Sequence, residues 1–195
     1  MKKPKRSLVQ RETLTRSELR ERLVSDSRAF FARHFATEDP RLEQLSCLHW
    51  TLCTLVCGHR LGLRLMPQAG TAAWRVLPEE LDDGEPTTHT HYSYVWEQDS
   101  RLTRAMIKRD RLPEMHVWCA DPARREIIDL SVRYQPESCR MRSGLQWLTP
   151  PPPDYLWTDE AGMPAGFHYE PSESATRLAM QYITNVMNSL PPGAR

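Results

Sequence analysis

Three residues of types that can carry out covalent catalysis together lie far apart in the sequence: Cys47, His116 and Asp129. An ionised thiol is a nucleophile, an imidazole can take up and return its proton, and a carboxylate can fix the tautomer of the imidazole. Such a set attacks the carbonyl carbon of an amide or an acyl group. The chain must bring the three side chains together for this chemistry to occur.

The segment from Ser46 to Gly58 is an apolar run that predicts a helix, with a serine cap at its start. Cys47 then lies in the first turn, where the helix dipole and free N–H groups favour the thiolate. Its backbone N–H would form part of an oxyanion hole. Cys53 faces elsewhere, since six residues correspond to roughly 240° of rotation, and Cys57 lies at the opposite end. Alternatively, residues 42–45 continue into this helix, and Cys47 is then mid-helix.

His116 and Asp129 lie on two predicted strands, Met115–Cys119 and Glu126–Leu130, joined by a turn at Asp121–Arg125. A two-residue loop would place His116 directly opposite Asp129, with side chains roughly 5 Å apart. Two-residue hairpins prefer positive φ angles, which proline cannot adopt, so a longer loop is an alternative. A register slip of two residues keeps both side chains on one face, whereas a slip of one separates them. We expect Val117 and Ile128 on the face opposite to His116.

This order resembles the transglutaminase-like branch of the papain-like cysteine enzyme superfamily, which includes the arylamine N-acetyltransferases. The motifs are Cys47 at the start of a buried helix, the strand His116-Val117-Trp118 and the strand Ile127-Ile128-Asp129-Leu130. The resemblance covers Ser46 to Ser131. It implies Cys47 as the nucleophile, His116 as general base and later acid, and Asp129 as the group that orients His116. It also implies a thioester intermediate and neither a metal nor an organic cofactor.

Two tryptophans near these residues are candidate substrate contacts. Trp118 shares the strand face of His116 and could form a wall of the site, and Trp50 follows Cys47 by three residues. Tryptophan side chains more often pack in a core, which is the alternative for both. The substrate class that follows is a protein or a small molecule with an amide or acyl bond.

Composition excludes several other classes of protein. The chain has 195 residues, 39% of them apolar, and a formal net charge of +1, which gives no strong signal for nucleic-acid binding. Five cysteines are an odd number, so a reducing, cytoplasmic location is the simpler interpretation. No apolar segment is long enough to cross a membrane. We expect a basic arm at residues 1–14 and a single domain at residues 15–195.

The remaining pattern predicts an α+β fold in which N-terminal helices and a C-terminal helix pack on an antiparallel sheet. Predicted elements are a capped helix at Thr15–Phe35, strands at Leu63–Leu65, Thr71–Leu77 and His89–Trp96 with a turn at Gly70, a short charged helical connection at Arg101–Arg111, and a final helix to Leu190. After the polyproline segment Thr149–Pro153, the residues up to Pro171 are expected to form a long irregular loop.

Two rival hypotheses use the same residues differently. His89 and His91 share a strand face and could bind zinc with His116, but no metal-binding spacing of cysteines or histidines supports this. The other is a catalytically inactive papain-like fold that binds protein or nucleic acid through its basic arm and its aromatic, proline-rich loop. Selective reaction of Cys47 with a thiol reagent would distinguish an enzyme from a binding module.

Overall fold

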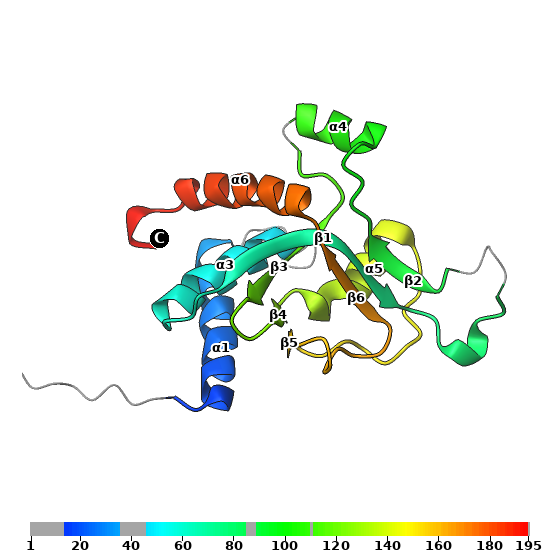
Figure 1. Ribbon diagram of the computed structural model, residues 1–195, viewed down its shortest axis with the longest axis horizontal. Coiled ribbons are helices and arrows are strands. Elements are labelled where there is room, and N and C mark those ends of the chain that lie inside the picture. The colour runs from blue at the N-terminus through cyan, green and yellow to red at the C-terminus, as the bar shows by residue number, and fades with distance from the viewer. Residues whose placement is uncertain (1–13, 36–45, 85–88, 110, 195) are drawn as a thin grey trace, which may run out of the picture.

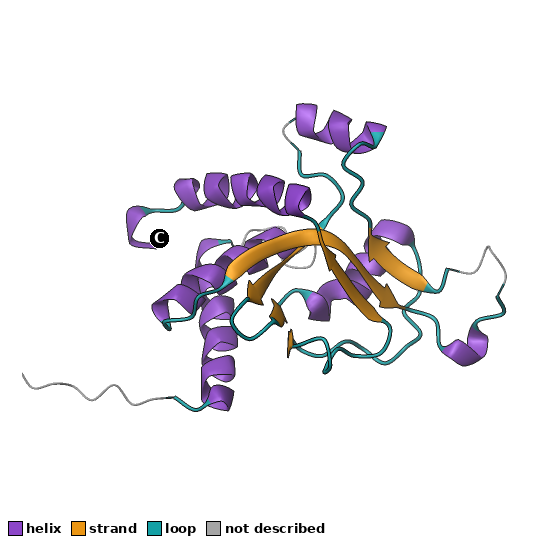
Figure 2. Ribbon diagram, viewed as in Figure 1, coloured by secondary structure: helices purple, strands orange, loops and turns teal. Residues whose placement is uncertain are grey.

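The computed structural model describes residues 14–35, 46–84, 89–109 and 111–194, which form an α+β fold (Figures 1 and 2). The helices are α1 (Arg16–His34), α3 (Cys47–Arg60), α4 (Arg101–Lys108), α5 (Gln135–Ser143) and α6 (Glu173–Ser189). The strands are β1 (Met66–Arg75), β2 (His91–Tyr94), β3 (His116–Asp121), β4 (Glu126–Asp129), β5 (Leu156–Thr158) and β6 (Phe167–Pro171). Short 3-10 turns lie at Glu79–Leu81, Val132–Tyr134 and Pro192–Ala194. The predicted α+β class is confirmed.

Side-chain caps set the start of the long helices, as the sequence predicts. Thr15 and Glu18 form a reciprocal capping box at the start of α1. Ser172 accepts a hydrogen bond from the N–H of Ala175 at the start of α6. Both predicted helices are confirmed, with bounds within a residue or two of those expected. The predicted basic arm falls almost entirely on residues 1–13, outside the described residues.

The six strands form one antiparallel sheet in the order β2-β1-β3-β4-β5, and β6 also pairs with β1. The first half of β1 pairs with β3, and its second half pairs with β2 and β6. The long strand β1 is therefore the element to which most of the sheet is attached.

The predicted turn at Gly70 is wrong, because Gly70 lies inside β1. The strand predicted at Leu63–Leu65 is also wrong, since these residues precede β1 and belong to no strand. A Cβ atom at this position would lie 2.1 Å from the carbonyl oxygen of Glu170. A glycine inside a strand marks the close approach of another backbone, here that of β6. Gly70 thus permits the pairing of β6 with β1.

The hairpin between β3 and β4 has the predicted turn but a longer loop. Asp121 pairs with Glu126, so four residues form the loop, and Arg125 has a positive φ of 56°. This register shifts the pairing by two residues, and the expectation that His116 lies directly opposite Asp129 is wrong. The two residues are diagonal neighbours on the same face, as a two-residue slip requires.

The prediction of an irregular loop up to Pro171 is also wrong in part. This segment of the chain contains β5, which pairs with β4, and β6, which pairs with β1. Both strands are short, and their partners lie far away in the sequence, so the local pattern gives little sign of them.

The sheet separates two hydrophobic clusters. Val117, Cys119 and Ile128 pack with α1, α3 and α6 on one side. Trp74, Tyr92 and Tyr94 pack with residues of α5 and of the 3-10 turn before it on the other. Val117 and Ile128 therefore lie on the face opposite to His116, whose ring contacts Trp74 and Tyr94. Within the described ranges, no helix is both long and apolar enough to cross a membrane.

Candidate active site

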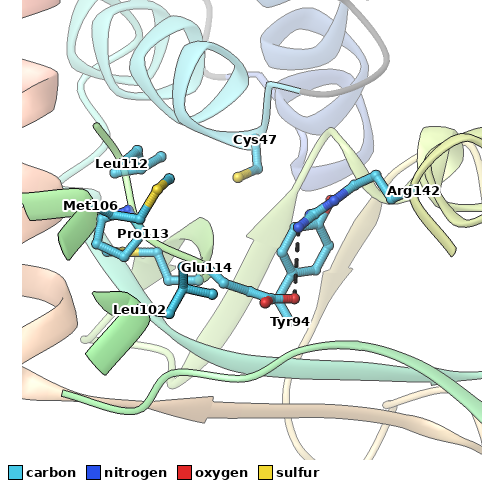
Figure 3. Close-up of a pocket in the computed structure, with 9 residues that line it drawn as sticks. Cys47, Tyr94, Leu102, Met106, Leu112, Pro113, Glu114 and Arg142 are labelled. Atoms are coloured by element: carbon cyan, nitrogen blue, oxygen red, sulfur yellow. Dashed lines mark ion pairs between the residues drawn. The ribbon is translucent and has the colours of Figure 1, made fainter. Parts of the chain in front are cut away.

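Cys47 is the first residue of α3, as the sequence predicts. Ser46 precedes it with φ −115° and ψ 75°, outside the helical region, and its hydroxyl accepts a hydrogen bond from the N–H of His49. The helix therefore begins here, although residues 42–45 lie outside the described residues. The Cys47 side chain lies at the wall of a pocket with its sulfur directed into it (Figure 3). The thiol thus meets the free N–H groups and the positive end of the helix dipole.

The structure brings His116 and Asp129 into direct contact. The Nε2 atom of His116 lies 2.7 Å from Oδ2 of Asp129, and both side chains are almost fully buried. An ionised carboxylate can only accept hydrogen bonds, so Nε2 carries the proton that is donated. Diagonal neighbours on adjacent strands are within reach of such long side chains. The other ring nitrogen, Nδ1, remains for a different partner.

Asp129 is held by four hydrogen bonds, one of them from His116. Its Oδ1 accepts from the backbone N–H of Ser131 at 2.8 Å and from the Ser131 hydroxyl at 2.6 Å. The Tyr169 hydroxyl donates to Oδ2 at 2.9 Å. Burial alone would raise the pKa of Asp129, but the charge and hydrogen bond of His116, with those of Ser131 and Tyr169, lower it below its usual range. The carboxylate is therefore ionised at neutral pH.

The imidazole of His116 is the group on which Cys47 and Asp129 both act. Its burial would lower the pKa, but the charge and hydrogen bond of Asp129, together with the nearby Cys47 thiol, raise it above the usual value for histidine. Among the described residues, Nδ1 has no hydrogen-bond partner of standard geometry. With Nε2 occupied by Asp129, Nδ1 is the nitrogen that can exchange a proton with the Cys47 sulfur.

Aromatic rings surround the imidazole and fix its orientation. Four ring centroids lie 5.0 to 6.0 Å from that of His116, those of Trp74, Tyr94, Trp118 and Tyr169. Rings at such distances pack closely and exclude water. The imidazole can therefore hold one position relative to the carboxylate.

The pocket beside Cys47 has a volume of about 310 Å³. It is lined by residues of α3, β2, α4, the segment before β3, and α5: Cys47, Tyr94, Leu102, Met106, Leu112, Pro113, Glu114, Met115 and Arg142. Figure 3 shows an apolar side formed by Leu102, Met106 and Leu112, and a polar side at Arg142. The Arg142 guanidinium lies 4.4 Å from the centre of the Tyr94 ring and 3.6 Å from a carboxylate oxygen of Glu114. A pocket of this size accepts one side chain or a small acyl group.

Neither tryptophan predicted to contact substrate is among the residues that line this pocket. Trp50 stacks between Phe31 and Tyr134 in the core. Trp118 is 1% exposed and donates its indole N–H to Gln68. Both side chains are buried, so we assign them to the core. The Trp118 ring lies beside the rings of His116 and Tyr169.

Sequence reasoning missed Tyr169 and Ser131. Ser131 follows Asp129 by two residues, the spacing at which an aspartate side chain often caps the chain after it. Phe167 and Tyr169 alternate with polar residues after Gly166, which is a strand signal that could have predicted β6. The partner of Tyr169 could not be deduced, because 40 residues separate it from Asp129.

The four other cysteines lie in environments unlike that of Cys47. Burial raises the pKa of each of their thiols above the usual value for cysteine, and none is among the residues that line the Cys47 pocket: Cys53, Cys57, Cys119 and Cys139. All five cysteines are free thiols. The described residues contain no group of three or more acidic, histidine or cysteine side chains that could hold a metal ion. His89 and His91 are exposed.

Comparison of the chain with models of known protein families, with curated proteins and with solved structures gave no match.

Proposed function

We propose that this protein is a cysteine-dependent enzyme of the transglutaminase-like, papain-like kind, which acts on an amide or acyl bond through a thioester. The observation that carries the proposal is the pairing of His116 Nε2 with Asp129 at 2.7 Å, which leaves Nδ1 of the same ring without a hydrogen-bond partner among the described residues. The Cys47 thiol lies close enough to this ring to help raise the pKa of His116. A carboxylate, an imidazole and a thiol in series are the arrangement that activates a thiol nucleophile.

In the proposed reaction, His116 holds the proton of Cys47 on Nδ1, and the resulting thiolate attacks the carbonyl carbon of the substrate. The carbonyl π electrons move to oxygen, and the tetrahedral intermediate collapses as Nδ1 gives its proton to the leaving amine or alcohol. The acyl group then forms a thioester with Cys47. Water or an amine, deprotonated by His116 Nδ1, attacks the thioester, and the thiolate leaves and is again paired with the imidazolium.

Asp129 takes no proton in these steps and acts on His116. It keeps the donated proton on Nε2 and stabilises the imidazolium by its charge. The first backbone N–H groups of α3, including that of Cys47, supply a donor for the developing oxyanion. Such a donor typically contributes about 3 kcal/mol of transition-state stabilisation.

Reaction with iodoacetamide at pH 7 tests this function directly. We expect alkylation of Cys47, which lines the pocket, well before that of the four other cysteines, as shown by peptide mass spectrometry at short times. His116→Ala should slow this reaction, while Asp82→Ala, a change in a surface loop, should leave it unchanged. Equal or absent labelling of all five cysteines would contradict the proposal and favour a binding module.

A further inference from the structure

Helix α4 stands apart from the sheet (Figure 1) and combines apolar and basic side chains that the rest of the described structure leaves exposed. Leu102 and Ile107 are 64% and 42% exposed. Five cations of α4 and the residues after it are exposed: Arg101, Arg104, Lys108, Arg109 and Arg111. A serine cap at Ser100 fixes the start of the helix. A basic amphipathic helix of this kind is typical of a surface that binds a partner.

These cations differ from most arginines of the protein in their electrostatic environment. Arg75, Arg133 and Arg140 each lie within 4 Å of a carboxylate. Within the described part of the chain, no ion pair involves the five cations at α4. Their positive charge is therefore available to a ligand from outside the chain.

The same helix forms one side of the Cys47 pocket. Leu102 and Met106, four residues apart, lie on one face of α4 and line the pocket (Figure 3). Residues seven positions apart lie on the same side of a helix, two turns apart. Arg101 and Lys108 therefore share one side of α4, next to the side that carries Leu102. Arg109, seven residues after Leu102, lies at the end of the Leu102 side. A ligand that places an apolar group against Leu102 therefore has cations beside it.

We propose that α4 docks an acidic polypeptide segment whose apolar residue enters the Cys47 pocket, so that the substrate of this enzyme is a protein chain with carboxylates near the reacting group. The eight residues of α4 span about 12 Å, the length of roughly four extended residues. The exposed carboxylates Glu97 and Asp99 precede α4 closely in the chain, and the exposed Glu114 lines the pocket. Carboxylates in these positions suit a polypeptide better than the uniform charge of nucleic acid or an anionic bilayer.

This inference rests on the proposed function for its chemistry, but binding can be measured without turnover. The probe is the fluorescein-labelled hexapeptide EELAEE, and its partner is the full-length chain carrying Cys47→Ala. We expect fluorescence anisotropy to show binding at least about tenfold tighter than that of KKLAKK in 50 mM salt, and loss of most of that preference in 0.5 M salt.

Charge reversal separates α4 from the rest of the surface. Arg101→Glu combined with Lys108→Glu should weaken EELAEE binding at least about fivefold. Arg33→Glu combined with Arg64→Glu changes the net charge equally, but on two exposed residues outside α4: Arg33 lies in the last turn of α1, and Arg64 follows the end of α3. This pair of changes should leave binding unchanged. Circular dichroism checks that each variant is folded. Leu102→Ser, which keeps every charge, should also weaken binding.

Three results would overturn the docking proposal: equal binding of the two peptides, equal effects of the two charge reversals, or tighter binding of a DNA duplex or of phosphatidylserine vesicles than of EELAEE. Alkylation of Cys47 in the unmodified chain remains the separate test of the proposed function. Selective alkylation without a peptide preference would refute docking alone, whereas peptide binding without selective alkylation would refute the enzyme and leave a peptide-binding surface.

Discussion

At the scale of single residues, the candidate site depends on the four hydrogen bonds that the Asp129 carboxylate accepts. Two donors on Ser131 orient one carboxylate oxygen, while His116 and Tyr169 share the other. A buried carboxylate with these partners stays ionised and cannot rotate without losing hydrogen bonds. The orientation of the imidazole follows from this arrangement, because Nε2 has one fixed acceptor.

Tyr169 is a positioning residue that acts on Asp129, and Tyr169→Phe tests this role. We expect the rate of the proposed reaction to fall about tenfold, since a hydrogen bond to a charged group contributes about 1.5–3 kcal/mol. The Tyr169 hydroxyl helps to lower the pKa of Asp129. Its loss should therefore raise that pKa and move the acid limb of the pH–rate profile to higher pH.

The matched control for this change is Tyr155→Phe. Tyr155 packs at the edge of the core, and the described contacts of Asp129 do not include it. The control should leave both the rate and the acid limb unchanged. A Tyr169→Phe protein that loses stability but keeps the wild-type pH profile would show that Tyr169 has a structural role only.

The His116–Asp129 pair should also make the stability of the protein depend on pH. The raised pKa of His116 adds stability that is fully present below the unfolded pKa of histidine, near 6.5, and is lost as pH rises through the folded value. The lowered pKa of Asp129 adds stability above the unfolded pKa of aspartate, near 3.9, which is lost as pH falls through the folded value.

Urea unfolding of wild-type protein and of His116→Gln at several pH values measures this effect. The difference in free energy of unfolding should be largest in the window between the two unfolded values and should shrink as pH rises through the raised pKa of His116. A difference that is constant from pH 5 to pH 10 would mean that the histidine is neutral in the folded protein.

At the scale of elements, the site needs one helix terminus and three strands to meet. Helix α3 supplies the thiol, β3 and β4 supply the imidazole and carboxylate, and β6 supplies Tyr169. Local sequence signals set the start of α3 and the β3–β4 turn, and both were predictable from Ser46 and from the Asp121-Pro122 pair. The contact between β6 and β1 depends instead on the absence of a side chain at Gly70.

Gly70→Ala should therefore affect the site from a distance. A methyl group 2.1 Å from the Glu170 carbonyl oxygen must displace β6, and we expect a loss of about 2 kcal/mol or more in the free energy of unfolding. Because β6 carries Tyr169, the variant should also lose reaction rate. Thermal and urea unfolding measure the first effect.

Gly193→Ala is the control, since a Cβ atom there meets nothing within 4 Å and should change stability by less than about 0.5 kcal/mol. Equal stability of the two variants would show that β6 can move away from β1 without cost, and that Gly70 has no special role.

At the scale of the whole molecule, the sequence predicted the class of fold, the capped helices and the three residues of the candidate site. It did not predict the single strand β1 or the strands β5 and β6, and it gave core packing of Trp50 and Trp118 only as the alternative to contact with substrate. Those features depend on contacts between distant segments, such as Trp74 with Phe167 and Gly70 with Pro171. The spacing of apolar residues shows only which side of a helix or strand is buried. It could therefore place Trp118 on the same strand face as His116, but it could not show that the Trp118 indole donates a hydrogen bond to Gln68.

The central claim is that Cys47, His116 and Asp129 act as one unit, and the pH dependence of Cys47 alkylation tests it most directly. An isolated thiol titrates near pH 8.5, so its alkylation slows about tenfold for each pH unit below that value. A thiolate paired with an imidazolium keeps its reactivity at lower pH. The measurement is the rate of iodoacetamide incorporation at Cys47 between pH 5.5 and 9 in wild-type, His116→Ala and Asp129→Asn proteins.

We predict that the wild-type rate falls less than about threefold between pH 9 and pH 6.5, and that the His116→Ala rate falls like that of an isolated thiol. Asp129→Asn should lie between them, because the imidazolium loses its stabilising charge. A wild-type profile that superimposes on that of His116→Ala would contradict the account, since Cys47 and His116 would then not share a proton.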